Sequence, residues 1–178
     1  VNYKEKPDVG TFMREWLSLY DSKSGERGIY NGLSAKKTVE RINERYRNED
    51  GNYIRRREPR TDFGTNPCSE IILRSREFCN LSECIVRRDD TSESLKEKVR
   101  VATILGTFQS TLTEYKYISR EWKRNCDDER LLGVSLTGIM DSPLTNGTKK
   151  GLEKLLQELR DLAYETNKEW ADKLGIKR

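Results

Sequence analysis

Five consecutive residues, Asn66-Pro67-Cys68-Ser69-Glu70, bring together an amide, a thiol and a carboxylate. A cysteine thiol can act as a nucleophile or a reductant, an ionised carboxylate accepts protons, and an amide both donates and accepts hydrogen bonds. The segment ends a turn-rich stretch and precedes a short apolar run, so we expect these groups at a junction between a loop and a strand. If Glu70 begins that strand, the alternation of side chains directs Cys68 and Glu70 toward the same side.

Purely structural roles can explain the same residue types. Cys68 can be a small buried hydrophobic residue, Asn66 can form a turn before a proline, and Glu70 can be a surface charge. The five residues by themselves leave both interpretations open.

The composition narrows the possible chemistry. The chain has 178 residues, with 34 Lys and Arg against 30 Asp and Glu, four Cys and no His. Without His, this stretch cannot carry a Ser-His-Asp or Cys-His catalytic group, a His-ligated zinc site or a His axial ligand to a haem or corrin. The cysteines, Cys68, Cys79, Cys84 and Cys126, include no C-x-x-C pair, which argues against a zinc ribbon. The thiols are therefore either buried and inert or used in catalysis.

The sequence shows no membrane or export signal. No apolar run approaches the roughly 20 residues needed to cross a bilayer, and the first residues lack the apolar core of a signal peptide. We therefore expect a soluble, cytoplasmic chain without membrane contact. Arg55, Arg56, Arg57 and Arg60 form a basic cluster, but the net charge is only +4. We interpret the cluster as a solvated loop or a phosphate-facing surface rather than as a nucleic-acid site.

Apolar periodicity predicts alternating helices and strands. Apolar residues recur at intervals of three and four, as in amphipathic helices, in four segments: residues 8–20, a segment starting at 34, 91–115 and 148–174. Short apolar runs predict three strands: residues 70–73, 80–86 and 131–136. A long charged loop is expected over 48–65. Buried strands alternating with amphipathic helices indicate an α/β architecture.

Four sequence blocks extend the motif around Cys68 along almost the whole chain. They are Ser-Lys-Ser-Gly-Glu-Arg-Gly-Ile-Tyr-Asn (22–31), Gly-Thr-Asn-Pro-Cys-Ser-Glu-Ile (64–71), Phe-Cys-Asn-Leu-Ser-Glu (78–83) and Arg-Leu-Leu-Gly-Val-Ser-Leu-Thr-Gly (130–138). Their order and spacing resemble the adenosylcobalamin-dependent (class II) ribonucleotide reductases. The similarity looks closest to the ribonucleoside-triphosphate reductases, including phage-type versions, and the diphosphate-reducing branch remains open. The chain departs from the family at Gly32, where Arg is more frequent, which weakens a ligand-binding role for that segment.

The resemblance implies a fold. The catalytic subunit of that family is a ten-stranded α/β barrel with a finger loop inserted through its centre, and the loop tip would hold Cys68. Residues 1–178 would then form a single partial domain, the central part of the barrel. The family's N-terminal strand, its glycine- and serine-containing phosphate loop and its C-terminal cysteine pair have no counterpart in this sequence. We therefore expect an internal fragment or one part of a split reductase, inactive alone.

The resemblance also implies roles for four residues. Cys68 would be oxidised to a thiyl radical by the 5′-deoxyadenosyl radical and would remove the 3′-hydrogen of the ribonucleotide. Glu70 would take the 3′-hydroxyl proton, and Asn66 would orient the substrate. Cys79 would be one of two reducing thiols that become a disulfide, with its partner cysteine absent from this chain. It should project into the barrel rather than into the apolar layer outside.

The implied cofactor is adenosylcobalamin, for which the resemblance assigns no contacting residue and no metal ligand. The implied partners are a ribonucleoside triphosphate substrate, thioredoxin or a similar dithiol reductant, a deoxynucleotide effector bound outside this segment, and the remaining parts of the reductase. The product would serve DNA synthesis in the cytoplasm of a bacterium, including a bacterium infected by a phage that encodes the chain. We interpret Cys84 as a buried structural thiol and Cys126 as a structural residue at a helix end.

Two other functions remain open. One is a ribonucleoside-diphosphate reductase of another class with the same barrel and an external radical generator, because the Asn-Pro-Cys-x-Glu block alone does not separate the classes. The other is a non-catalytic interaction domain with inert thiols, which the polar composition favours. Cobalamin dependence distinguishes the first from a class II enzyme, and substrate protection of Cys68 from alkylation distinguishes the second.

Overall fold

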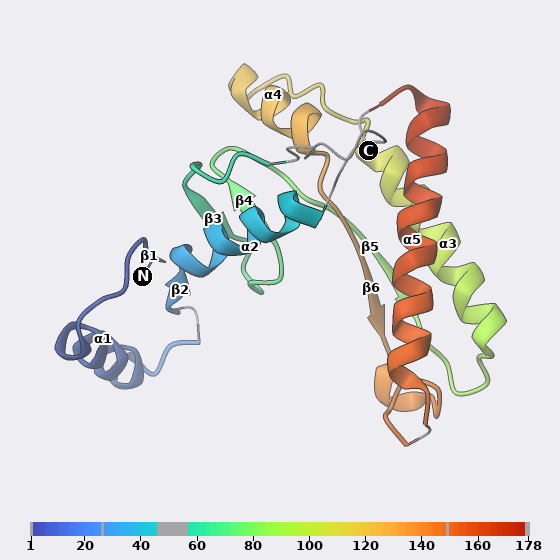
Figure 1. Cartoon of the computed structure of the whole chain (residues 1–178), viewed down its shortest axis with the longest axis horizontal. Helices are drawn as coiled ribbons and strands as arrows, with labels where there is room; N and C mark the ends of the chain where they lie inside the picture. Colours follow the sequence, from blue (N-terminus) through green and yellow to red (C-terminus); the bar gives the residue numbers. More distant parts are fainter. Residues whose placement is uncertain (1, 26, 46–56, 149, 177–178) are drawn as a thin grey trace. The chain divides into compact units, whose positions relative to one another are not determined.

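The computed structural model describes residues 2–25, 27–45, 57–148 and 150–176. The chain divides into two compact units, an N-terminal unit, Val1–Ser75, and a C-terminal unit, Arg76–Arg178. Both units combine helices with short strands (Figure 1), so the predicted α/β class is confirmed. The strands of the described residues form three two-stranded sheets, none of which closes into a barrel. The ten-stranded barrel and the single partial domain stay predictions.

The N-terminal unit contains two short parallel strands, two helices and a β-hairpin. The parallel strands are β1 (Asn2–Tyr3) and β2 (Tyr30–Asn31), and the helices are α1 (Val9–Ser22) and α2 (Gly32–Arg45). The hairpin pairs β3 (Phe63–Thr65) with β4 (Ile72–Arg74) in antiparallel orientation.

A small core joins α2 to the hairpin. Ala35, Val39 and Phe63 are buried together, and Tyr30 and Ile72 pack against them. The hairpin was not predicted, because residues 63–65 were assigned to a loop over 48–65. The part of that loop at 48–56, which includes the basic residues Arg55 and Arg56, lies outside the described residues. Tyr46, predicted to lie on the apolar face of the helix that starts at 34, also lies outside them.

The start of α1 follows the sequence prediction because Asp8 caps it. Asp8 Oδ1 accepts a hydrogen bond from the backbone N–H of Thr11 at 2.9 Å. The apolar residues of α1 lie along one stripe, yet none of them is buried in the described part of the chain; Val9 and Tyr20 are 79% and 75% exposed. Among the described residues, α1 has only peripheral contacts, such as the Phe12 ring 6.5 Å from that of Tyr3, so capping and periodicity account for this helix without a buried face.

The first turn of α2 begins at Gly32, two residues before the predicted start at Ser34. The Asn31 side-chain oxygen accepts a hydrogen bond from the Ser34 N–H at 2.9 Å and so caps the helix. A Cβ at position 32 would lie 2.5 Å from Asn2 Oδ1 and 3.0 Å from the Tyr3 carbonyl oxygen. The close approach of β1 therefore explains glycine at the position where the chain departs from the resembled family.

The C-terminal unit is built on two parallel strands. β5 (Asn80–Ile85) pairs with β6 (Leu132–Thr137), with Asn80 opposite Leu132 and Ile85 opposite Thr137. These strands confirm the predicted strands 80–86 and 131–136 and the parallel direction of the second, although β6 is half-buried rather than fully buried. The helices are α3 (Ser92–Gln109), α4 (Arg120–Glu129), the 3-10 turn η1 (Ile139–Asp141) and α5 (Leu152–Leu174).

One face of this strand pair carries the core. α3 packs against both strands and against α5, as Figure 1 shows. The buried residues of the core share this layer: Cys84, Val86, Leu95, Val99, Ala102 and Leu159. Side chains of β5 at even positions therefore face α3, and those at odd positions face the other side.

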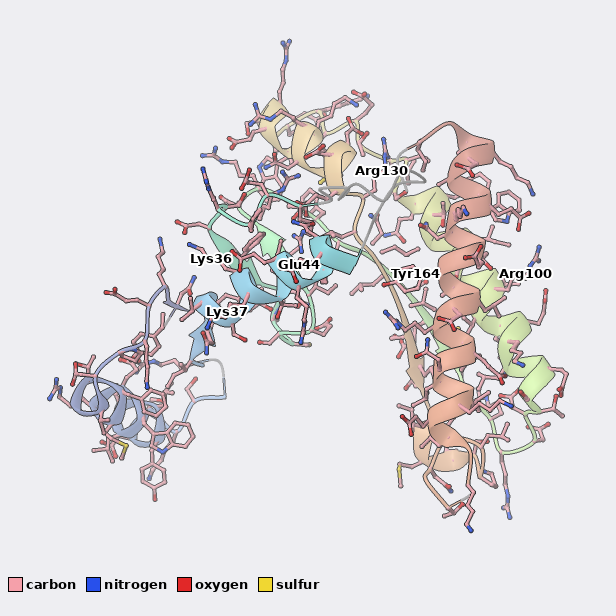
Figure 2. All side chains as sticks on the ribbon, in the orientation of Figure 1. Lys36, Lys37, Glu44, Arg100, Arg130 and Tyr164 are labelled. Carbon is pink, nitrogen blue, oxygen red and sulfur yellow. The ribbon has the colours of Figure 1, made fainter. Side chains whose placement is uncertain are left out.

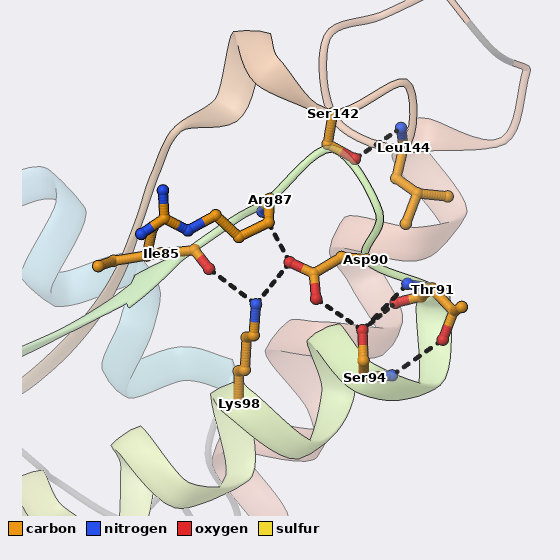
Figure 3. A network of polar contacts seen from close by, with 8 residues as sticks. All are labelled: Ile85, Arg87, Asp90, Thr91, Ser94, Lys98, Ser142 and Leu144. Atoms are coloured by element: carbon orange, nitrogen blue, oxygen red, sulfur yellow. Dashed lines mark hydrogen bonds and ion pairs between the residues drawn. The ribbon is translucent and has the colours of Figure 1, made fainter.

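The junction between β5 and α3 is held by a polar network (Figure 3). Thr91 and Ser94 form a capping box, each side chain accepting the other residue's backbone N–H. Asp90 accepts hydrogen bonds from Lys98 at 2.6 Å, from the Arg87 N–H at 2.7 Å and from the Ser94 hydroxyl at 2.7 Å. The Lys98 hydrogen bond is the main reason that the pKa of Asp90 is lowered to about 2.

α3 ends at Gln109, so the predicted helix over 91–115 is too long. The hydroxyls of Ser110 and Thr111 donate to carbonyl oxygens three residues earlier, at 2.7 Å each. These bonds satisfy the last carbonyls locally and compete with continuation of the helix. Leu112, expected on the buried stripe, is 72% exposed as a result.

The C-terminal helix starts at Leu152, four residues later than predicted, after Gly151 with a φ of 98°. None of the helices among the described residues is both long enough and apolar enough to cross a membrane.

Candidate active site

The predicted catalytic segment lies on the loop of the β3–β4 hairpin. Thr65 pairs with Ile72, so residues 66–71 form the connection between the strands. Glu70 therefore lies within the loop, and the prediction that it begins a strand is wrong. Side chains alternate between the two faces only within a strand. Because Cys68 and Glu70 lie in a loop, alternation no longer predicts that they point toward the same side.

A tight turn presents the thiol of Cys68. The Ser69 N–H donates to the Asn66 carbonyl oxygen at 3.0 Å, which closes a four-residue turn. Pro67 occupies the second position, where its fixed φ favours a turn, and Ser69 adopts the left-handed region with a φ of 66°. Cys68 occupies the third position and is exposed. The alternative that Cys68 is a small buried residue is therefore wrong.

The Asn66 side chain links both parts of the loop. Its Oδ1 accepts a hydrogen bond from the Ile71 N–H at 3.1 Å, and its Nδ2 donates to Glu70 Oε1 at 2.5 Å. Both groups of one amide are thus used, one for the backbone and one for the carboxylate. The structure therefore places the amide, the thiol and the carboxylate on a single six-residue loop.

Arg57 supports the base of the hairpin. Its Nη2 donates to the Ile72 carbonyl oxygen at 2.9 Å, and its guanidinium lies 5.0 Å from the centre of the Phe63 ring. The Asn43 side chain of α2 holds the Arg57 backbone with hydrogen bonds of 2.7 and 3.1 Å. Arg57 therefore has a structural role at the base of the hairpin.

Cys79 belongs to the C-terminal unit and directly precedes β5. It is half-buried, and the following Asn80 N–H already donates to the Leu131 carbonyl oxygen at 2.8 Å. Leu81 and Ile85, at odd positions of β5, are 47% and 48% exposed. The same alternation, extended back by two residues, places Cys79 on their face, opposite to the α3 layer.

The other two thiols are buried, which was predicted for Cys84. Cys84 is 4% exposed within the core, and burial raises the pKa of its thiol. Cys126 is 5% exposed and lies near the end of α4, as expected. Among the described residues, no group of three or more His, Cys, Asp or Glu is placed to hold a metal ion.

Sequence analysis placed Cys126 at a helix end but gave no bounds for that helix, α4, which contacts the segment that contains Cys79. A signal was present: Ser119 is a favoured N-cap residue, Glu121 suits the first turn, and Trp122 and Cys126 are four residues apart. The helix is short and strongly charged, so its apolar stripe consists of only these two residues. They nevertheless contact Phe78, the residue before Cys79.

Comparison with known proteins gives one informative match. The chain is 33% identical over 129 residues to an adenosylcobalamin-dependent ribonucleoside-triphosphate reductase of Lacticaseibacillus paracasei. The match covers 70% of this chain, and the chain spans 15% of that protein. No protein-family profile matches the chain. No solved structure matches it.

Proposed function

We propose that this chain is the finger-loop part of a class II ribonucleotide reductase, which reduces ribonucleotides, by resemblance the triphosphates, to 2′-deoxyribonucleotides. The observation that carries the proposal is the loop over 66–71, where an exposed thiol shares one tight turn with an amide and a carboxylate. The similarity to the reductase of Lacticaseibacillus paracasei supports the same reaction.

Cys68 is proposed as the residue that becomes a thiyl radical. When bound, adenosylcobalamin supplies the organic radical that oxidises this thiol. Cys68 fits this role because its sulfur is exposed at the apex of a turn and can be approached from outside the loop. Its contribution is position, since hydrogen transfer requires the sulfur within roughly 3–3.5 Å of the sugar carbon. We assign no residue of this chain to holding the corrin.

Glu70 is proposed as the base for the 3′-hydroxyl. After Cys68 has removed the 3′-hydrogen, the carboxylate takes the 3′-hydroxyl proton, and the 2′-hydroxyl leaves as water with a proton that one of the reducing thiols supplies. The Asn66 amide donates to one carboxylate oxygen and leaves the second oxygen to accept a proton. Asn66 is proposed to orient both the base and the substrate.

Cys79 is proposed as one of the two thiols that supply the electrons. Each thiol gives up one electron and one proton, and the two sulfurs join as a disulfide, which thioredoxin or a similar dithiol then reduces. The second thiol comes from a part of the reductase outside this chain. The orientation of Cys79 away from the α3 layer is the one that a thiol facing a barrel interior needs.

The test is substitution in the reductase assembled from this chain and the segments that complete it. Cys68→Ser should abolish both deoxynucleotide formation and substrate-coupled radical formation, because the O–H bond of serine is too strong to relay the radical. Cys79→Ser should retain radical formation and lose product in a single turnover, together with the disulfide. Cys84→Ser, at a buried thiol of the core, is the control and should remain active.

Turnover by the Cys68→Ser protein would reject the thiyl assignment, and a normal single-turnover yield from Cys79→Ser would reject the reducing role. Activity without added adenosylcobalamin would favour a reductase with an external radical generator. Because Cys68 is exposed, rapid alkylation alone does not distinguish a catalytic thiol from an inert one. Protection of Cys68 by the ribonucleotide substrate does, and its absence would favour an interaction domain.

A further inference from the structure

We propose that α4 positions Cys79. Its residues Cys126, Trp122 and Asn125 do so by contacting the residues that precede this thiol. The inference rests on the proposed role of Cys79 as a reducing thiol. It assigns a function to a buried cysteine that the reaction itself does not use.

The first contact is a hydrogen bond to sulfur. The backbone N–H of Phe78 donates to Cys126 Sγ at 3.3 Å, across 48 positions of sequence. Cys126 is almost fully buried, so its sulfur takes the place of the strand partner that the amide of Phe78 would otherwise need. Tyr115 lies at the same sulfur: burial and a hydrogen bond with the Cys126 thiol raise the pKa of its phenol.

The second contact is aromatic. The Phe78 ring stacks on Trp122 of α4 with centroids 4.5 Å apart and an interplanar angle of 27°. It also meets the edge of Tyr115 at 5.2 Å and 70°. Both geometries are favourable for ring pairs, so backbone and side chain of Phe78 are fixed by the same helix and its preceding loop.

Further contacts hold both sides of the segment. Asn125 Nδ2 donates to the Arg76 carbonyl oxygen at 3.3 Å, and the Arg76 side chain pairs with Glu121. On the other side, the Asn80 side chain and backbone both donate to the Leu131 carbonyl oxygen, at 3.1 and 2.8 Å. Residues before and after Cys79 are therefore anchored on α4 and on the short connection from α4 to β6.

α4 is itself anchored to the end of α3. Arg130, labelled in Figure 2, forms an ion pair with Asp127 at 2.9 Å and donates to the Ser110 carbonyl oxygen. Lys123 adds a second ion pair to Asp127 at 3.0 Å. α4 therefore contacts both the end of α3 and the segment over 76–80, and it fixes the one relative to the other.

Such positioning matters for a reducing thiol in particular. A disulfide forms only when the two Cα atoms lie about 4.4–6.8 Å apart with matching Cβ directions. Cys79 lies one residue before β5, so strand alternation sets the face on which it lies, but the strand pairing itself does not hold it there. Contacts at positions 76, 78 and 80 supply the missing constraint.

The experiment compares Cys126→Ala with Cys126→Ser in the full chain. Cys126→Ala removes the sulfur and should speed amide hydrogen exchange of Phe78 about fivefold, the effect of one lost hydrogen bond. It should also speed alkylation of Cys79 by iodoacetamide about threefold. Serine offers an oxygen acceptor at the same place and should restore both rates in large part. Alkylation is followed for each cysteine by peptide mass spectrometry, with exposed Cys68 as the internal reference.

Cys84→Ala is the matched control, because it removes another buried thiol of the same unit from the α3 face of β5. It should leave the Phe78 and Cys79 rates unchanged, so equal effects from both alanine variants would overturn the proposal. If Cys126→Ala does not fold, Glu121→Gln loosens the Arg76 anchor at the surface and should raise the Cys79 rate by a smaller factor. Unchanged rates in the folded variants would also overturn it.

In the assembled reductase, Cys126→Ala should lower kcat for reduction without changing the KM for the ribonucleotide or radical formation at Cys68. If Cys126→Ala lowers product formation but leaves the alkylation rate of Cys79 unchanged, the loss does not arise from the position of Cys79, and the proposal is contradicted. If Cys79→Ser leaves the reductase active, the proposed function of Cys79 fails, while the exchange and alkylation results still report whether α4 holds this segment.

Discussion

The loop of Cys68 and the segment of Cys79 are stabilised in opposite ways. The first is local: the hydrogen bonds that shape the loop involve Asn66 and join residues no more than five positions apart. The second depends on α4, whose contacts with residues 76 and 78 cross 45 to 49 positions of sequence. The exposed thiol of Cys68 lies on a turn held by its own residues and can contact a reactant from outside. The half-buried thiol of Cys79 lies at a strand end and needs tertiary packing to hold its orientation.

This difference explains how well each region could be predicted. Asn-Pro followed by Cys-Ser is a turn signal that acts through the backbone preferences of four residues, so the loop position of Cys68 was predictable. The hairpin partner of the loop was not, because β3 and β4 have three residues each and show no period in so short a run. The contact between Cys126 and Phe78 had no sequence signal, because a buried sulfur that accepts from an amide looks like any core cysteine.

Among the substitutions that test this difference between the Cys68 loop and the Cys79 segment, Glu70→Gln should have the largest effect. Glutamine keeps an oxygen for the Asn66 amide, so the local loop should persist, but it cannot accept the 3′-hydroxyl proton. Reduction by the assembled enzyme should slow by about 100-fold or more at unchanged nucleotide binding. The measurement is single-turnover product formation beside substrate binding, with Glu153→Gln, at an exposed residue of α5, as the control. An unchanged rate would remove Glu70 from the mechanism.

A smaller effect is expected from Asn66→Ala, which removes the hydrogen bonds between the two parts of the loop but keeps the thiol of Cys68 and the carboxylate of Glu70. The Ile71 N–H loses its acceptor, so its hydrogen exchange should speed by about five- to tenfold, the effect of a hydrogen bond worth about 1 kcal/mol. Asn66→Asp retains an acceptor and should protect Ile71. The Phe78 amide should not respond to either variant; a response there would show that the loop and the β5 segment are not independent.

The smallest effect on stability is expected when acid protonates Asp90, which follows the C-terminal end of β5. The pKa of Asp90 is lowered from 3.8 to about 2, first by the Lys98 hydrogen bond and then by Arg87 N–H and Ser94. A carboxyl with a lowered folded-state pKa stabilises the fold above its unfolded pKa, so this contribution should be lost as pH falls from 4 toward 2. We expect about 1 kcal/mol, since the partner Lys98 is partly exposed to solvent.

Hydrogen exchange measures that loss at the Arg87 amide, which donates to Asp90. Its protection, corrected for intrinsic exchange, should fall over this pH range, while the Ile71 amide keeps its neutral Asn66 acceptor. Asp90→Asn should remove the pH dependence at Arg87. A dependence that survives this substitution would assign the effect to another carboxylate.

The sequence by itself determined the α/β class, the capped start of α1, the parallel strands β5 and β6 and the turn that carries Cys68. These features depend on side-chain period, capping residues and proline, which act over a few neighbouring residues. Only the tertiary structure decided that Glu70 stays in a loop and that α4 holds the residues around Cys79. The first depends on the pairing of β3 with β4, and the second on contacts across 45 to 49 positions of sequence; the energy of such contacts cannot be read from either partner segment alone.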